Sequence, residues 1–128
     1  MAPMSRRLLA VAAAVLLVGV ACSGQTSSAP KPFCENAYRY EAELEREQTS
    51  GKVDAAKQIS LFRQSVATAP PTVHADAERF LDTLVRVQAD PNVRKDRSII
   101  EPAHQAVDRV NRYASNRCVL FNQQPTGI

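Results

Sequence analysis

The chain has 128 residues, which is enough for one small domain. It contains four Phe, three Tyr and no Trp, so any core must be built mainly from Ala, Val, Leu and Ile. The formal net charge is only +3, and two of the 16 basic residues, Arg6 and Arg7, lie at the extreme N-terminus. This balance gives no case for nucleic-acid binding, so we expect no nucleic-acid partner.

The first 21 residues have the layout of a secretory signal peptide. Arg6 and Arg7 precede an apolar run, residues 8–21, that ends in small residues. As a helix, this run of about 14 residues would extend roughly 21 Å, too short for a bilayer core of about 30 Å. We therefore expect residues 1–21 to be cleaved rather than to span a membrane. Cleavage would leave 107 residues, with 14 basic against 13 acidic side chains.

The stretch Val18-Gly19-Val20-Ala21-Cys22-Ser23-Gly24 resembles the lipobox of bacterial lipoproteins. The resemblance implies cleavage before Cys22 by signal peptidase II and attachment of a diacylglyceryl group to that cysteine. Gly19 departs from the family pattern, in which Leu is usual three residues before the cysteine, and this bears on the efficiency of cleavage. The alternatives are an ordinary signal peptide followed by secretion, and an uncleaved anchor.

Residues 22–32 are predicted to be the lipidated cysteine and a flexible tether. Residues 23–32 are rich in Ser, Pro and Gly and lack apolar periodicity. If extended, they would reach up to about 35 Å from the lipid. A helical domain is expected over residues 33–122, followed by a frayed C-terminus at residues 123–128.

The first two helices are predicted over residues 33–49 and 53–68. Gly51 lies where a glycine in the left-handed conformation would end the first helix, and Pro70-Pro71 would stop the second. Their apolar stripes recur at helical spacing: Phe33, Ala37, Tyr40 and Leu44, then Ala56, Ile59, Phe62, Val66 and Ala69. The other face of the first helix is acidic, with Glu35, Glu41, Glu43, Glu45 and Glu47.

A third helix is predicted to open with Thr72 as its N-cap and to end before Asp90-Pro91. Residues 92–97 read as a polar, basic connection. A fourth helix would begin at Glu101-Pro102, or three residues earlier if Ser98 and Glu101 form a capping box. The apolar stripes are Val73, Ala77, Phe80, Leu81, Leu84 and Val87, then Ala103, Val107, Val110, Ala114, Cys118 and Phe121.

These patterns predict an all-α fold, an up-down-up-down bundle of four helices. With Cys22 lipidated, Cys34 and Cys118 remain, and an even pair in an exported protein indicates a disulfide. An even number of antiparallel helices brings these two positions to the same end of the bundle, so the pairing and the helix count support each other. The first helix is also acidic and the last basic, which fits either neighbouring helices or two unrelated solvated faces.

The chain offers little for catalysis or metal binding. His74 with Glu78 and Glu101 with His104 are pairs at helical spacing, but both lie near helix N-termini that the predicted topology places at opposite ends. The sequence also lacks the Gly-x-Ser-x-Gly, Ser-x-x-Lys, Cys-x-x-Cys and His-Glu-x-x-His motifs. The basic run at residues 94–97 would contact anionic lipid or cell-wall polymer, or form a solvated loop. We expect no catalytic residue, no metal, no cofactor and no enzymatic activity.

Overall, the chain resembles small actinobacterial lipoproteins that carry a lipobox, a Ser/Pro-rich tether and a helical domain with two cysteines. The resemblance implies a protein held on the extracytoplasmic face of the cell membrane by lipid on Cys22. With no catalytic set, we expect a non-catalytic binding or scaffolding module with an envelope protein as partner. The alternative is a carrier of a small apolar ligand or a metal within the helical bundle.

Overall fold

The computed structural model describes residues 28–118. Within this range the protein contains four α-helices, one short 3-10 helix and no strand, so the prediction of an all-α fold is confirmed. The predicted signal peptide, Cys22, Phe121 and residues 123–128 lie outside the described residues. In chain order the elements are α1 (Lys31–Ser50), α2 (Ala55–Thr68), α3 (Pro71–Ala89), η1 (Pro91–Lys95) and α4 (Arg97–Arg117).

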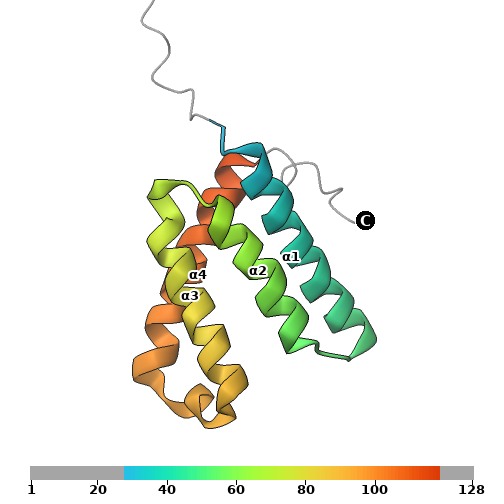
Figure 1. Cartoon of the computed structure of the whole chain (residues 1–128), viewed down its shortest axis with the longest axis vertical. Coiled ribbons are helices and arrows are strands. Elements are labelled where there is room, and N and C mark those ends of the chain that lie inside the picture. The colour runs from blue at the N-terminus through green and yellow to red at the C-terminus, as the bar shows by residue number, and fades with distance from the viewer. Residues whose placement is uncertain (1–27, 119–128) are drawn as a thin grey trace, which may run out of the picture.

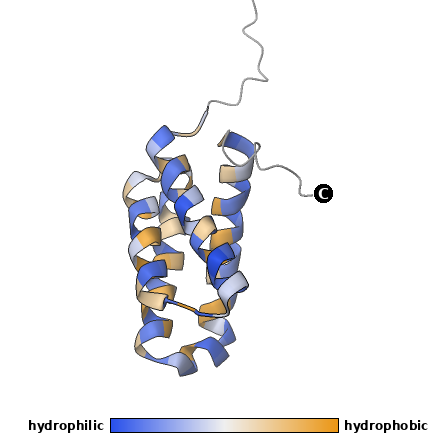
Figure 2. Cartoon of the chain, turned by 90° about the vertical axis from the view of Figure 1, so that its right-hand side faces the viewer, coloured by the Kyte–Doolittle hydropathy of each residue, from blue (hydrophilic) through white to orange (hydrophobic). Residues whose placement is uncertain are grey.

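The helices form two packed pairs. α1 packs against α2, α3 packs against α4, and α2 joins the pairs by packing against α3. Figure 1 shows the α1–α2 pair and the α3–α4 pair meeting at the end where the described chain begins and ends. Figure 2 shows hydrophobic and hydrophilic residues alternating along each helix, as expected where one side of a helix is buried.

A single apolar core connects the two pairs through aromatic rings. Tyr40 on α1 meets Phe62 on α2 with ring centroids 4.9 Å apart, and Phe62 meets Phe80 on α3 at the same distance. Both contacts are edge-to-face, the arrangement that aromatic quadrupoles favour. Around them lie the buried residues Ala29, Phe33, Cys34, Val66, Val73, Ala77, Val110, Ala114 and Cys118.

The predicted disulfide is confirmed. Cys34, near the start of α1, is bonded to Cys118, the residue that ends α4, with their Cα atoms 5.5 Å apart. Beside it, the Ala29 N–H donates to the Arg117 carbonyl at 3.2 Å, and Phe33 packs edge-on to Tyr113. The start of α1 is therefore held to the end of α4. The chain departs here from the expected tether, because Ala29 is buried and Lys31 is already helical.

The ends of α1 and α2 follow the sequence signals closely. Gly51 has the predicted left-handed conformation with φ 71°, and its N–H donates to the Glu47 carbonyl at 2.8 Å. This conformation favours glycine because it lacks a Cβ. α2 begins at Ala55, two residues later than predicted, because Asp54 caps it by accepting the Lys57 N–H; it ends at Thr68, before the two prolines, as predicted.

The predicted starts of α3 and α4 were wrong. Thr72 is not an N-cap, because α3 already begins at Pro71, whose missing N–H costs nothing in the first turn. α4 begins at Arg97, and its N-cap is Asp96, whose carboxylate accepts the Ser98 N–H at 3.0 Å. Ser98 and Glu101 therefore form no capping box. Much of the expected loop is η1, which Asp90 caps through the Asn92 N–H.

Candidate functional site

A pocket of about 370 Å³ lies between α3 and α4. This volume is within the range of small-molecule sites, which is roughly 300–1,000 Å³. Phe80, which lines the pocket, also contacts Phe62 on α2, so the pocket adjoins the core. Its lining residues are Phe80, Thr83, Leu84 and Val87 from α3, Arg94 from η1, and Ile100, Ala103 and His104 from α4.

The two helices contribute side chains of different sizes to the pocket. α3 presents large side chains at Phe80, Leu84 and Val87, whereas α4 contributes Ile100 and the small, buried Ala103. The polar lining residue Thr83 is satisfied within its own helix, since its hydroxyl donates to the Arg79 carbonyl at 3.1 Å. The interior of the pocket is therefore chiefly apolar.

Positive charge lies at the edge of this pocket. Arg94 is the one lining residue with a formal charge at pH 7, and His104 adds a ring that can donate a hydrogen bond. A second, adjoining pocket of about 340 Å³ shares Ile100 and His104 and is also lined by Arg97 and Glu101. Within residues 28–118, neither Arg94 nor Arg97 makes an ion pair.

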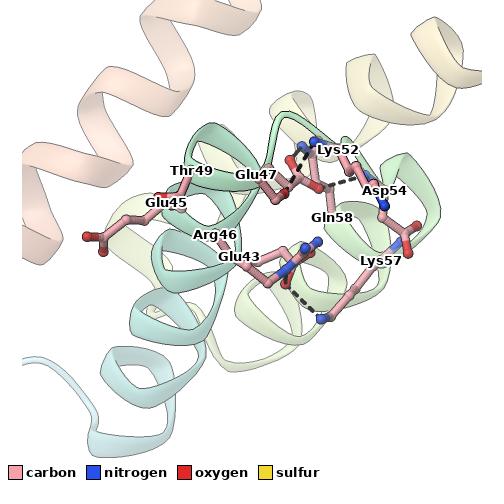
Figure 3. Close-up of polar contacts among 10 residues, drawn as sticks. Glu43, Glu45, Arg46, Glu47, Thr49, Lys52, Asp54, Lys57 and Gln58 are labelled. Carbon is pink, nitrogen blue, oxygen red and sulfur yellow. Dashed lines mark hydrogen bonds and ion pairs between the residues drawn. The ribbon is translucent and has the colours of Figure 1, made fainter.

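Two buried carboxylates form a polar cluster between α1 and α2 (Figure 3). Glu43 is 5 % exposed and accepts from the Arg46 Nε at 3.1 Å, and the Lys57 Nζ lies 2.7 Å from its carboxylate. Hydrogen bonds from Arg46 and then Lys57 lower the pKa of Glu43 to about 2. The group therefore stays ionised at neutral pH and makes a poor proton carrier.

Glu47 ties the loop between the two helices to α1. It is also 5 % exposed, and its carboxylate accepts the Asp54 N–H at 2.8 Å and the Gln58 side-chain amide. Nearby, burial raises the pKa of Tyr40 to about 12, with the Glu41 and Glu47 charges adding to the effect. Because internal donors occupy Glu43 and Glu47, the arrangement is that of a structural tie rather than an acid–base pair.

The residues considered for a metal are not brought together. His74 and Glu78 lie on α3 with Nδ1 and Oε2 3.7 Å apart, whereas Glu101 and His104 line the adjoining pocket on α4. Among residues 28–118, no three His, Cys, Asp or Glu side chains are grouped so as to hold a metal ion. The basic run divides between η1 and the start of α4, which places Arg94 and Arg97 at the two pockets.

Sequence reasoning missed both the polar cluster and the pocket. A signal for the cluster existed, because the apolar stripe of α1 ends at Leu44 and the next inward position, three residues on, is Glu47. The pocket had no comparable signal. Four of its lining residues, Phe80, Leu84, Val87 and Ala103, belong to stripes that we predicted only as core, and α3 and α4 pack around Ala103 in a way that depends on the full structure.

No family model, no curated protein and no solved structure matches the chain. Within residues 28–118, no helix has both the length and the apolar content needed to cross a membrane.

Proposed function

We propose that this protein is a lipoprotein anchored through Cys22 to the extracytoplasmic face of the cell membrane. Its helical domain would act there as a non-catalytic binding or scaffolding module for another envelope protein. The observation that carries the proposal is the N-terminal order of Arg6-Arg7, an apolar run and Ala21-Cys22. The Cys34–Cys118 disulfide supports it, because disulfides persist in oxidising compartments outside the cytoplasm.

The finer topology that we propose is an up-down-up-down bundle. Three observations support it: the short connections between helices, the packing of each helix against the next, and the bond from the start of α1 to the end of α4. In such a bundle the tether enters at the disulfide end. Figure 1 shows η1, in orange, at the opposite end of the molecule, so the pocket edge that carries Arg94 would face away from the membrane.

A diacylglyceryl group would hold the protein firmly. Each methylene buried in the bilayer contributes about 0.8 kcal/mol, and one acyl chain alone binds only marginally, whereas two give stable attachment. The proposal therefore predicts that membrane attachment depends on the lipid at Cys22.

Metabolic labelling tests the anchor. Cells expressing the full chain and fed radiolabelled palmitate should incorporate label into the protein, and the labelled protein should sediment with membranes. Cys22→Ala should lose the label, whereas Ser23→Ala, the adjacent control, should keep it. Label that persists in Cys22→Ala, or wild-type protein without label, would contradict the anchor.

Cross-linking in intact membranes tests the binding role. A short lysine- and carboxylate-directed reagent, followed by affinity purification of the full chain, should recover one envelope protein reproducibly. A control lipoprotein of similar size and abundance should not recover it. If the same set of abundant proteins is recovered with both baits, the scaffolding role is contradicted.

A second candidate function is favoured by the α3–α4 pocket: carriage of a small apolar ligand. The observation behind it is an apolar hollow of about 370 Å³ beside the core. Native mass spectrometry of the purified protein should show a bound small molecule, released on unfolding. Identical masses before and after unfolding would contradict ligand carriage without affecting the anchor.

A further inference from the structure

The lining of the α3–α4 pocket indicates a class of ligand. We propose that this pocket binds a fatty-acid anion, with the acyl chain against the apolar walls and the carboxylate held by Arg94. The proposal rests on the second candidate function, ligand carriage, and it does not depend on a protein partner.

The walls suit an acyl chain. Phe80, Leu84 and Val87 on α3 and Ile100 on α4 line the pocket and are only half-buried, so they leave apolar surface in contact with water. Covering such surface with methylene groups is favourable because it removes apolar area from water. The Thr83 hydroxyl is already bonded to the Arg79 carbonyl and does not compete for a polar group.

The charge suits a carboxylate at one end of the chain. Arg94 projects from η1 into the pocket lining, and no acidic residue lines this pocket. A guanidinium can hold both oxygens of a carboxylate through two parallel hydrogen bonds. His104, on α4, supplies a further ring N–H or acceptor at the same pocket. An apolar cavity with a cation at its edge matches a molecule that is apolar along its length and anionic at one end.

Neighbouring pockets lack this combination. The pocket on another side of α3 and α4, about 360 Å³, contains Arg79 and Arg86 but also Glu78 and Asp82. The pocket near the disulfide end contains Arg109, Arg112 and Arg117, but its lining also includes the acidic Asp76, which binds Arg109. In the adjoining pocket, Arg97 shares the lining with Glu101. Of these four hollows, the one with Arg94 joins an apolar lining to an arginine without an acidic neighbour in that lining.

Photoaffinity labelling of the full chain in membranes tests the proposal. The probe is a palmitic-acid analogue with a diazirine in its chain, and the uncharged arm is the corresponding alcohol. After irradiation, peptide mass spectrometry should find the acid attached within residues 80–104. The alcohol should label these peptides about tenfold less, the factor expected when a charge-assisted hydrogen bond is lost.

Variants test the contact with the carboxylate and the contact with the acyl chain separately. Arg94→Ala should reduce labelling by the acid about tenfold, and Arg94→Lys should reduce it less, because the charge remains but the two parallel hydrogen bonds are lost. The matched control is Arg86→Ala, which removes an exposed arginine from the other side of α3 and should change nothing. Val87→Gln should reduce labelling by both probes, since it makes the apolar wall polar.

The results distinguish a failure of the fatty-acid proposal from a failure of ligand carriage as a whole. Equal labelling by acid and alcohol, unchanged by Arg94→Ala, would overturn the fatty-acid anion and leave an apolar ligand in place. No specific labelling by either probe, together with no bound mass in native mass spectrometry, would overturn ligand carriage as well. Unaltered thermal unfolding of each variant excludes misfolding as the cause of a lost signal.

Discussion

The two helix pairs fill the space between their helices in different ways. Between α1 and α2, the buried carboxylates of Glu43 and Glu47 meet donors from Arg46, Lys57, Gln58 and the Asp54 backbone. Between α3 and α4, apolar side chains surround a pocket. An ion pair joins these two helices at the surface, between Asp76 and Arg109. Polar contacts thus fill the space between α1 and α2, whereas α3 and α4 leave a chiefly apolar pocket between them.

The same contrast bears on the opposite charges of α1 and α4. The buried glutamate Glu43 pairs with Arg46 and Lys57, which lie in its own helix pair, rather than with the basic α4. The Arg109 on α4 likewise pairs with Asp76 on α3. In each helix pair, some charged side chains therefore form ion pairs with residues of the same pair. The start of α1 is held to the end of α4 by the disulfide, the Phe33–Tyr113 contact and the shared core.

The largest expected effect comes from removing the bond between the two pairs. Cys34→Ala with Cys118→Ala opens a loop with a sequence separation of 84. On the chain-entropy account, a loop of this length contributes about 4.5 kcal/mol to the free energy of unfolding. Urea denaturation of the oxidised protein and of the double variant measures the loss. A loss below about 1 kcal/mol would show that core packing alone holds the pairs together.

Removing the buried tie of the α1–α2 pair should have the next largest effect. Glu47→Ala leaves the Asp54 N–H and the Gln58 amide without their acceptor, which should cost about 2 kcal/mol because hydrogen bonds to buried charged groups are strong. Urea denaturation again provides the measurement. Glu45→Ala, an exposed glutamate on the same helix, is the control and should change the stability little. Equal losses in the two variants would contradict the tie.

Acid should weaken the α1–α2 pair through Glu43. The folded-state pKa of this carboxyl, lowered by Arg46 and Lys57 to about 2, lies below its ordinary value of 4.5. The resulting stability is fully present above pH 4.5 and is lost as the pH falls toward 2. The urea midpoint of the wild type should therefore fall more steeply across this window than that of Glu43→Gln. If the urea midpoints of the two proteins change in parallel with pH, the ion pairs of Glu43 contribute nothing to stability.

The smallest expected effect is that of the surface pair on α3 and α4. Arg109 donates from Nε and Nη2 to the two Asp76 oxygens at 2.9 and 2.7 Å. Because both side chains are partly solvated, a double-mutant cycle with alanine should give a coupling of about 0.5–1 kcal/mol, reduced in high salt. A coupling above about 2 kcal/mol would mean that the α3–α4 pair, too, depends on a polar tie.

Much of the fold could be predicted because it follows from local signals. Apolar spacing located the helices, Gly51 and the prolines fixed two ends, and the expectation of export implied that Cys34 and Cys118 pair. Predictions failed where neighbouring signals compete. Ser98 and Glu101 have the spacing of a capping box, but the Asp96 carboxylate accepts the Ser98 N–H, so Asp96 is the N-cap and α4 begins at Arg97.

The candidate site was harder to predict because it depends on packing between helices. Glu43 and Glu47 have the charge of surface residues, and only Lys57, Gln58 and the loop at Asp54, which come later in the chain, make their burial favourable. The hollow beside Ala103 depends on how closely α3 and α4 approach each other. A periodic stripe shows which residues face inward but not whether they fill the space between them.

An intact mass of the protein purified from membranes, before and after reduction and alkylation, tests the central claim most directly. That claim is a chain anchored through Cys22 and closed by the Cys34–Cys118 bond. We predict the mass of a chain that begins at Cys22 and carries acyl groups, with two thiols that react with the alkylating reagent only after reduction. An unacylated mass would make the protein a secreted factor, and two thiols reactive without reduction would contradict the bond that joins α1 to α4.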